Sequence, residues 1–124
     1  MRFITSAAFA VVACASAATA FAQPAHLTDA QFIAANRCLG LMSSKTLATP
    51  DAAVLSRYLD AESDGRVPLA YDEASDARDN ARRQANHSDA YSDGRLIAER
   101  DGVCRQFVDA AAATAAAPRS AHAS

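Results

Sequence analysis

Apolar side chains recur every three or four residues along most of the chain, which is the spacing of a helix that buries one face. The first such segment begins at Thr28, where Thr28 and Gln31 have the spacing of a capping box. Its apolar positions are Phe32, Ala35, Cys38, Leu39 and Met42. We therefore expect a first helix from Thr28 to about Ser43, with Cys38 on its buried face.

A second and a third helix are predicted between residues 49 and 86. The second begins at Thr49, with Pro50 in the first turn, and ends at Asp64-Gly65. Its apolar stripe is Val54, Leu55, Tyr58 and Leu59. The third, from about Leu69 to Asn86, holds almost no large apolar residue but carries one stripe of alanines at Ala70, Ala74, Ala77, Ala81 and Ala85. Two interpretations stay open: a largely solvated helix docked by its alanines, or a seam that receives a partner helix.

The fourth predicted helix runs from Ser88 or Ser92 to about Ala112, and Gly94 and Gly102 allow a later start or a kink. Its expected core face consists of Leu96, Ile97, Val103, Cys104, Phe107 and Val108. No alternating strand pattern competes with these helices. The predicted fold is all-α, a small bundle of about four helices.

The first 22 residues have the order of a secretory signal peptide: Arg2, a short apolar run, and a small-residue tract that ends Ala20-Phe21-Ala22. The expected organisation is a signal peptide at 1–22, a helical domain at 23–112 and a disordered Ala-rich tail at 113–124. Val11-Val12-Ala13-Cys14 resembles a bacterial lipobox, so anchoring by a lipid on Cys14 is the alternative to periplasmic or secreted export.

Cleavage after Ala22 would leave two cysteines, Cys38 and Cys104, in an oxidising compartment. Both are expected on buried helix faces, and no C-x-x-C motif is present. A Cys38–Cys104 disulfide would bring the first and last helices side by side. We therefore interpret the pair as a structural staple rather than a redox-active couple.

The charge of the chain is nearly balanced, with 12 basic and 14 acidic residues and a formal net charge of −2 at pH 7. Positive and negative residues are interspersed, so the basic stripe that a nucleic-acid partner requires is not predicted. No segment after the signal peptide is long and apolar enough to predict a transmembrane helix. Another envelope protein is the partner class that remains.

One short sequence occurs twice, at Asp60–Val67 and at Asp89–Leu96, and either a decayed duplication or chance explains it. With Asp60, Glu62, Asp64 and Gly65, the first copy resembles the opening of an EF-hand calcium loop. The resemblance implies a weak calcium site at Asp60, Glu62 and Asp64. However, the twelfth position is Tyr71, which offers no carboxylate, and ordinary turn chemistry explains the same residues.

Catalytic patterns do not emerge from the sequence. The three histidines are not spaced with one another or with a cysteine as zinc ligands would be. We expect no enzyme, no catalytic residue and no cofactor. The leading hypothesis is a binding or structural accessory protein of a bacterial envelope. The alternatives are a periplasmic chaperone or stress protein, and a weak calcium binder.

Overall fold

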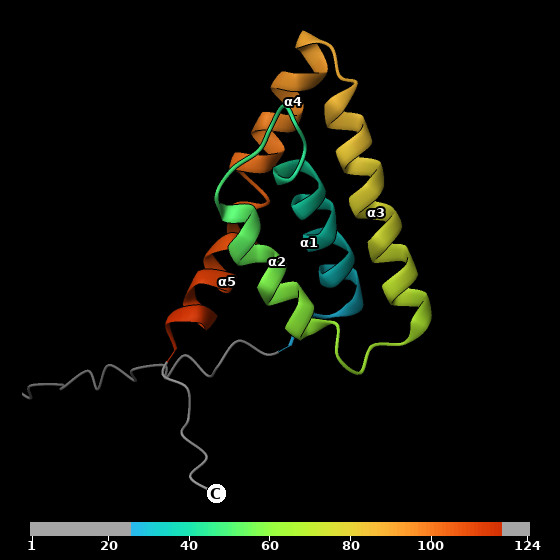
Figure 1. Cartoon of the computed structure of the whole chain (residues 1–124), viewed down its shortest axis with the longest axis vertical. Coiled ribbons are helices and arrows are strands. Elements are labelled where there is room, and N and C mark those ends of the chain that lie inside the picture. The colour runs from blue at the N-terminus through green and yellow to red at the C-terminus, as the bar shows by residue number, and fades with distance from the viewer. Residues whose placement is uncertain (1–25, 118–124) are drawn as a thin grey trace, which may run out of the picture.

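A computed structural model describes residues 26–117 of the chain. In that part, five helices follow one another: α1 (Asp29–Met42), α2 (Asp51–Glu62), α3 (Pro68–Asn86), α4 (Ala90–Asp101) and α5 (Arg105–Ala116) (Figure 1). The predicted all-α fold is confirmed. The predicted signal peptide and Cys14 lie outside the described residues.

The start of α1 follows directly from its sequence. The Thr28 hydroxyl accepts a hydrogen bond from the Gln31 N–H at 3.2 Å, and the Gln31 side chain accepts one from the Thr28 N–H at 2.9 Å. The predicted capping box is therefore confirmed, because each side chain satisfies a backbone donor that the first helical turn leaves free.

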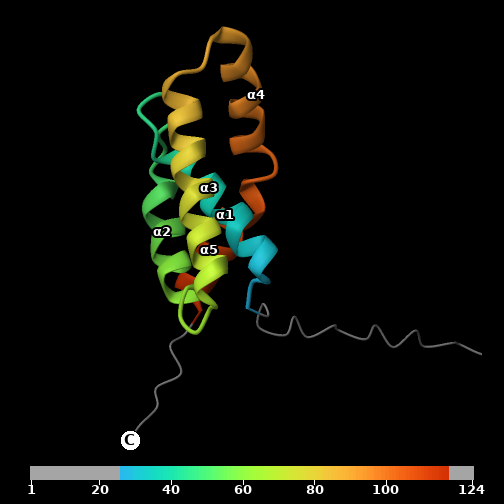
Figure 2. The ribbon, with the colours of Figure 1, turned by 90° about the vertical axis from the view of Figure 1, so that its right-hand side faces the viewer.

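Helix α1 lies at the centre of the molecule, between α3 on one side and α2 on the other (Figures 1 and 2). Buried side chains come from every helix, with most of the large ones on α1 and α2. The core consists of Phe32, Ala35, Cys38, Leu39, Leu41, Met42, Leu47, Leu55, Tyr58, Leu59, Ala74, Ala81, Ala85, Leu96, Cys104, Phe107, Val108 and Ala111. The predicted apolar faces of the first two helices are thus buried, with Val54 at the edge of the core.

Helix α3 makes its most extensive contact with α1 and docks through the predicted alanine stripe. Ala74, Ala81 and Ala85 are buried, while the outer face carries charged side chains. The close approach also requires Gly40 on α1. A Cβ atom there would overlap the carbonyl oxygen of Arg78 and lie 2.9 Å from the Cβ of Ala81.

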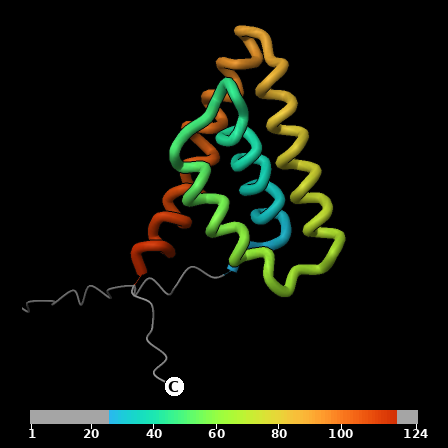
Figure 3. Tube along the Cα trace, in the orientation of Figure 1, coloured from blue at the N-terminus to red at the C-terminus, as the bar shows by residue number. Residues whose placement is uncertain are grey.

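The predicted fourth helix is interrupted, and the chain forms two successive helices, α4 and α5, in its place (Figure 3). The break lies at Gly102–Cys104, where the Cys104 N–H bonds to the Glu99 carbonyl at 3.1 Å, one residue beyond the helical partner. The helical phase therefore shifts. Ile97 and Val103 are 39% and 63% exposed, so their assignment to the core face was wrong.

The C-terminal boundary also differs from the prediction. Helix α5 continues to Ala116, so residues 113–116, expected in the disordered tail, are helical. Alanine has the highest helix propensity. In addition, the Thr114 hydroxyl donates a hydrogen bond to the Ala110 carbonyl within the same helix at 2.9 Å. Residues 118–124 lie outside the described part of the chain.

Cys38 on α1 and Cys104 before α5 form a disulfide, with 5.4 Å between their Cα atoms. Both residues are buried, as predicted from the helical pattern. The covalent link fixes the last third of the chain against the central helix. Within residues 26–117, no helix combines the length and apolar character needed to cross a bilayer.

Candidate functional site

A groove of about 550 Å³ lies between α2 and α5. The two helices run in the same direction, because Arg105 at the start of α5 pairs with Asp51 at the start of α2 at 3.1 Å. The groove extends along α2 from Val54 to Ala61 and along α5 from Ala111 to Ala117. Its lining residues are Val54, Arg57, Tyr58, Ala61, Ala111, Thr114, Ala115 and Ala117.

The groove is open and mainly apolar because most of the side chains that α5 contributes to it are the short methyl groups of alanine. Ala111, Ala115 and Ala117 face Val54 and Ala61 of α2. Larger residues at these α5 positions would fill the space between the helices. Ala115 and Ala117, which the sequence pattern placed in a disordered tail, thus form part of one wall of the groove. Its volume falls within the range of about 300–1,000 Å³ that is typical of small-molecule sites.

Three polar side chains interrupt this apolar lining, and one of them, Thr114, donates its hydroxyl to the Ala110 carbonyl within α5. Tyr58 is 8% exposed, yet its hydroxyl has no hydrogen-bond partner among residues 26–117 and is not sealed from solvent. Burial, followed by the negative charge of Glu62, raises the pKa of Tyr58, so the hydroxyl stays protonated and can donate. Arg57 is exposed, and it is the only charged residue that lines the groove within the described chain.

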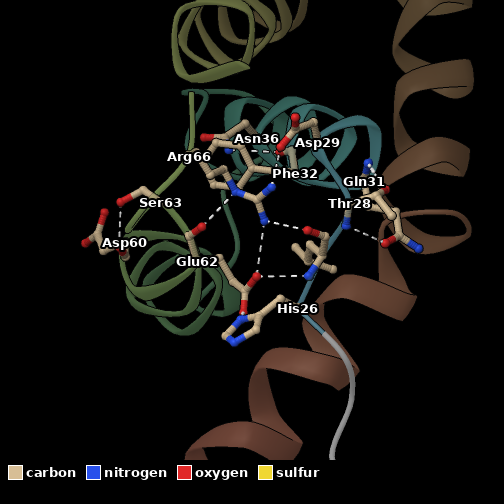
Figure 4. A network of polar contacts seen from close by, with 11 residues as sticks. His26, Thr28, Asp29, Gln31, Phe32, Asn36, Asp60, Glu62, Ser63 and Arg66 are labelled. Atoms are coloured by element: carbon tan, nitrogen blue, oxygen red, sulfur yellow. Dashed lines mark hydrogen bonds and ion pairs between the residues drawn. The ribbon is translucent and has the colours of Figure 1, made fainter. Parts of the chain in front are cut away.

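A second polar cluster joins the start of α1 to the end of α2 (Figure 4). The Arg66 guanidinium donates to the Leu27 carbonyl at 2.6 Å, to Asp29 at 2.7 Å and to the Glu62 carboxylate at 3.2 Å. It also lies over the Phe32 ring, 4.3 Å from the centroid. Its donors are used within the fold, so this cluster is structural.

Helix α4 is held by a further ion pair. Arg37 on α1 donates two hydrogen bonds to the Glu99 carboxylate, at 2.6 and 2.9 Å, and a third to Gln84 on α3 at 3.2 Å. The bond to Glu99 is the largest cause of the raised pKa of Arg37. Only Leu96 of α4 is buried, so this bidentate pair is the main polar attachment of the helix.

The residues of the calcium hypothesis have separate environments. Glu62 accepts hydrogen bonds from the Leu27 N–H at 2.9 Å and from Arg66, while Asp60 lies on another side of α2 (Figure 4). Glu62 and Asp64 border one hollow and Asp60 borders a different one. Within residues 26–117, no group of three or more His, Cys, Asp or Glu residues is placed to hold a metal ion. The calcium interpretation thus has no ligand cluster there.

The two copies of the short repeat adopt different structures. Asp60 lies in the last turn of α2, and its copy leads out of that helix into the turn before α3. Asp89 is the N-cap of α4, and its copy leads into that helix. The same residues therefore end one helix and begin another.

Sequence reasoning did not identify the groove. It placed Val54 and Tyr58 on the apolar stripe of the second helix but gave no role to Arg57. The usable indication was the alanine run after Val108, since a helix of small residues leaves space beside a neighbouring helix. Comparison of the chain with protein-family models, with curated proteins and with solved structures gives no match.

Proposed function

We propose that this chain is a small exported accessory protein of a bacterial envelope that acts by binding rather than by catalysis, through the groove between α2 and α5. The observation that carries the proposal is the groove itself, a preformed apolar hollow with the Tyr58 hydroxyl and the Arg57 guanidinium at its surface. A few polar groups in an apolar concavity are typical of sites that orient a ligand.

The export part of the proposal is supported by the disulfide. Disulfides persist in oxidising compartments. The Cys38–Cys104 disulfide contains both of the cysteines that would remain after cleavage at Ala22. The periplasm or the exterior is the proposed location, with a lipid anchor on Cys14 as the alternative. Intact mass of the protein from its own host, with and without reductant, separates a chain that begins at Gln23 from an acylated chain that begins at Cys14.

Site-specific photocrosslinking in the host envelope tests binding through the groove. A photoreactive phenylalanine analogue replaces Tyr58, whose ring already borders the groove, or, as the control, Asp76 on the exposed face of α3. We expect a defined adduct from position 58 and none from position 76. Equal adducts at both positions, or none at either, would contradict the proposal.

A chaperone or stress protein is the second candidate, and one observation favours it. Val67, Leu69 and Tyr71 occupy alternate positions at the start of α3 and are 57%, 67% and 53% exposed. Exposed apolar side chains of this kind are suited to transient contact with unfolded chains. An acid-responsive chaperone would bind an apolar dye increasingly from pH 7 to pH 3, whereas a flat profile would count against this candidate.

A further inference from the structure

The α2–α5 groove has little to offer the backbone of a peptide ligand. Along α2, the lining positions from Val54 to Ala61 lie within the helix, where N–H and C=O groups bond to one another. The Thr114 hydroxyl already donates to the Ala110 carbonyl. An extended peptide would therefore leave many of its own polar groups without partners against an apolar wall, which disfavours its binding.

A saturated hydrocarbon chain carries no such groups. It requires only apolar contact, which Val54, Ala61 and the alanines of α5 supply. The groove is therefore better matched to an alkyl chain than to a peptide.

The charge of the lining selects the head group. Arg57 is the only charged residue among the described groove residues, and no described carboxylate pairs with it. Tyr58 adds a hydroxyl that has no hydrogen-bond partner among residues 26–117. Both groups donate hydrogen bonds, and a carboxylate accepts such bonds at both of its oxygens.

We propose that the groove binds a single-chain amphiphile with an anionic head, a fatty-acid carboxylate, with the alkyl chain between α2 and α5 and the head at Arg57 and Tyr58. This inference rests on the proposed function, because it names the ligand class of the same groove. The C-terminal ends of α2 and α5 carry partial negative charge, so the anionic head belongs beside Arg57 rather than at those ends.

Isothermal titration calorimetry of the oxidised mature protein with dodecanoate, below the concentration at which it forms micelles, tests this proposal. We expect saturable binding of one dodecanoate per chain. Dodecyltrimethylammonium has the same tail with a cationic head, and acetate has the head without the tail. Both should bind at least tenfold more weakly than dodecanoate. Dodecyltrimethylammonium loses the charge-assisted hydrogen bonds of the head, and acetate loses the burial of several methylene groups.

Variants locate the site. Arg57→Gln should weaken dodecanoate binding about tenfold, and Tyr58→Phe should weaken it by a smaller factor. Ala115→Phe places a ring in the groove and should abolish binding. The control, Arg83→Gln, removes an equivalent exposed charge from α3, which does not line the groove, and should bind as the unmodified protein does. Thermal melts confirm that each variant is folded.

The two proposals fail in different ways. If dodecanoate gives no saturable heat, or if Arg57→Gln and Arg83→Gln bind it equally, the amphiphile assignment is wrong. A protein adduct from position 58 in the envelope would then keep the groove as a binding site for a protein. If position 58 gives no adduct of any kind, the proposed function is wrong as well. An adduct of fatty-acid mass at position 58 would support both.

Discussion

Two glycines show how differently the same residue can contribute to this fold. Gly40 lies where α1 meets α3, and its missing side chain is what allows Ala81 and the Arg78 carbonyl to approach. Gly94 lies in α4 with nothing within 4 Å of the position that a Cβ atom would take. Helix propensity favours alanine at both positions, but packing reverses that preference at Gly40.

Gly40→Ala should therefore lower the free energy of unfolding by about 1–3 kcal/mol, because the added methyl group forces α1 away from α3. Gly94→Ala is the matched control and should raise it by up to about 1 kcal/mol. Urea denaturation measures both. A stabilising Gly40→Ala change would show that the two helices are not in the close contact described.

Arg66 is the second residue on which local structure depends. Its side chain is 9% exposed, and its partners Leu27, Asp29 and Glu62 come from two segments of the chain. Arg66→Ala should lower the free energy of unfolding by about 3 kcal/mol, since it removes the cationic partner of the Glu62 carboxylate (10% exposed) and the donor to the Leu27 carbonyl.

Arg66→Lys should recover only part of this loss, because an ammonium group cannot reproduce the planar set of donors. Arg82→Ala, which removes an exposed pair with Asp79, should change stability by less than about 0.5 kcal/mol. Equal effects of the Arg66 and Arg82 changes in urea denaturation would contradict the role assigned to Arg66.

At the scale of elements, α4 is the least anchored of the five helices. It buries only Leu96 and depends on the Arg37–Glu99 pair, whereas α1 buries eight residues. We expect the amides of α4 to exchange with deuterium sooner than those of α1 and α3. Glu99→Gln should accelerate exchange in α4 selectively, and uniform acceleration across the molecule would indicate that the pair supports the whole fold instead.

The start of α4 should also respond to pH. The Ser92 N–H donates to the Asp89 carboxylate at 2.8 Å, and this bond is the first cause of the lowered pKa of Asp89. A carboxyl group with a lowered pKa in the folded state stabilises that state above its unfolded pKa of about 4. This contribution is lost as the pH falls through the folded pKa.

Asp89→Asn keeps a capping oxygen but removes the titration. Between pH 5 and pH 2.5, the melting temperature of this variant should therefore fall less than that of the unmodified chain. An identical pH dependence in the two proteins would show that Asp89 contributes nothing through its charge.

At the scale of the whole molecule, the disulfide adds to the limited stability that a small hydrophobic core provides. The cysteines are 66 residues apart, and the chain-entropy relation assigns about 4 kcal/mol to closing a loop of that length in the unfolded state. Combined Cys38→Ala and Cys104→Ala changes should lower the free energy of unfolding by about this amount. Reduction of the unmodified protein should have a similar effect in urea denaturation, and a loss below about 1 kcal/mol would contradict the role of the bond as a staple.

Much of the fold was predictable from local patterns. The capping box at Thr28, the apolar stripe of α2 and the burial of Cys38 and Cys104 depend on residues within one or two helical turns. The exposure of Ile97 and Val103 was not predictable, because it depends on where a helix with two glycines breaks. Both glycines permitted a break, and the structure has it at Gly102.

The sequence by itself determined the helical class, the start of α1 and the pairing of Cys38 with Cys104, because capping, periodicity and the positions of the cysteines are properties of the chain. Only the tertiary structure decided that Gly40 lies at the contact of α1 with α3 and that Glu62 accepts a hydrogen bond from Arg66. It also decided that Arg57 and Tyr58 border a groove. These features arise between helices distant in the chain, and the angle at which two helices meet is set by all the side chains between them.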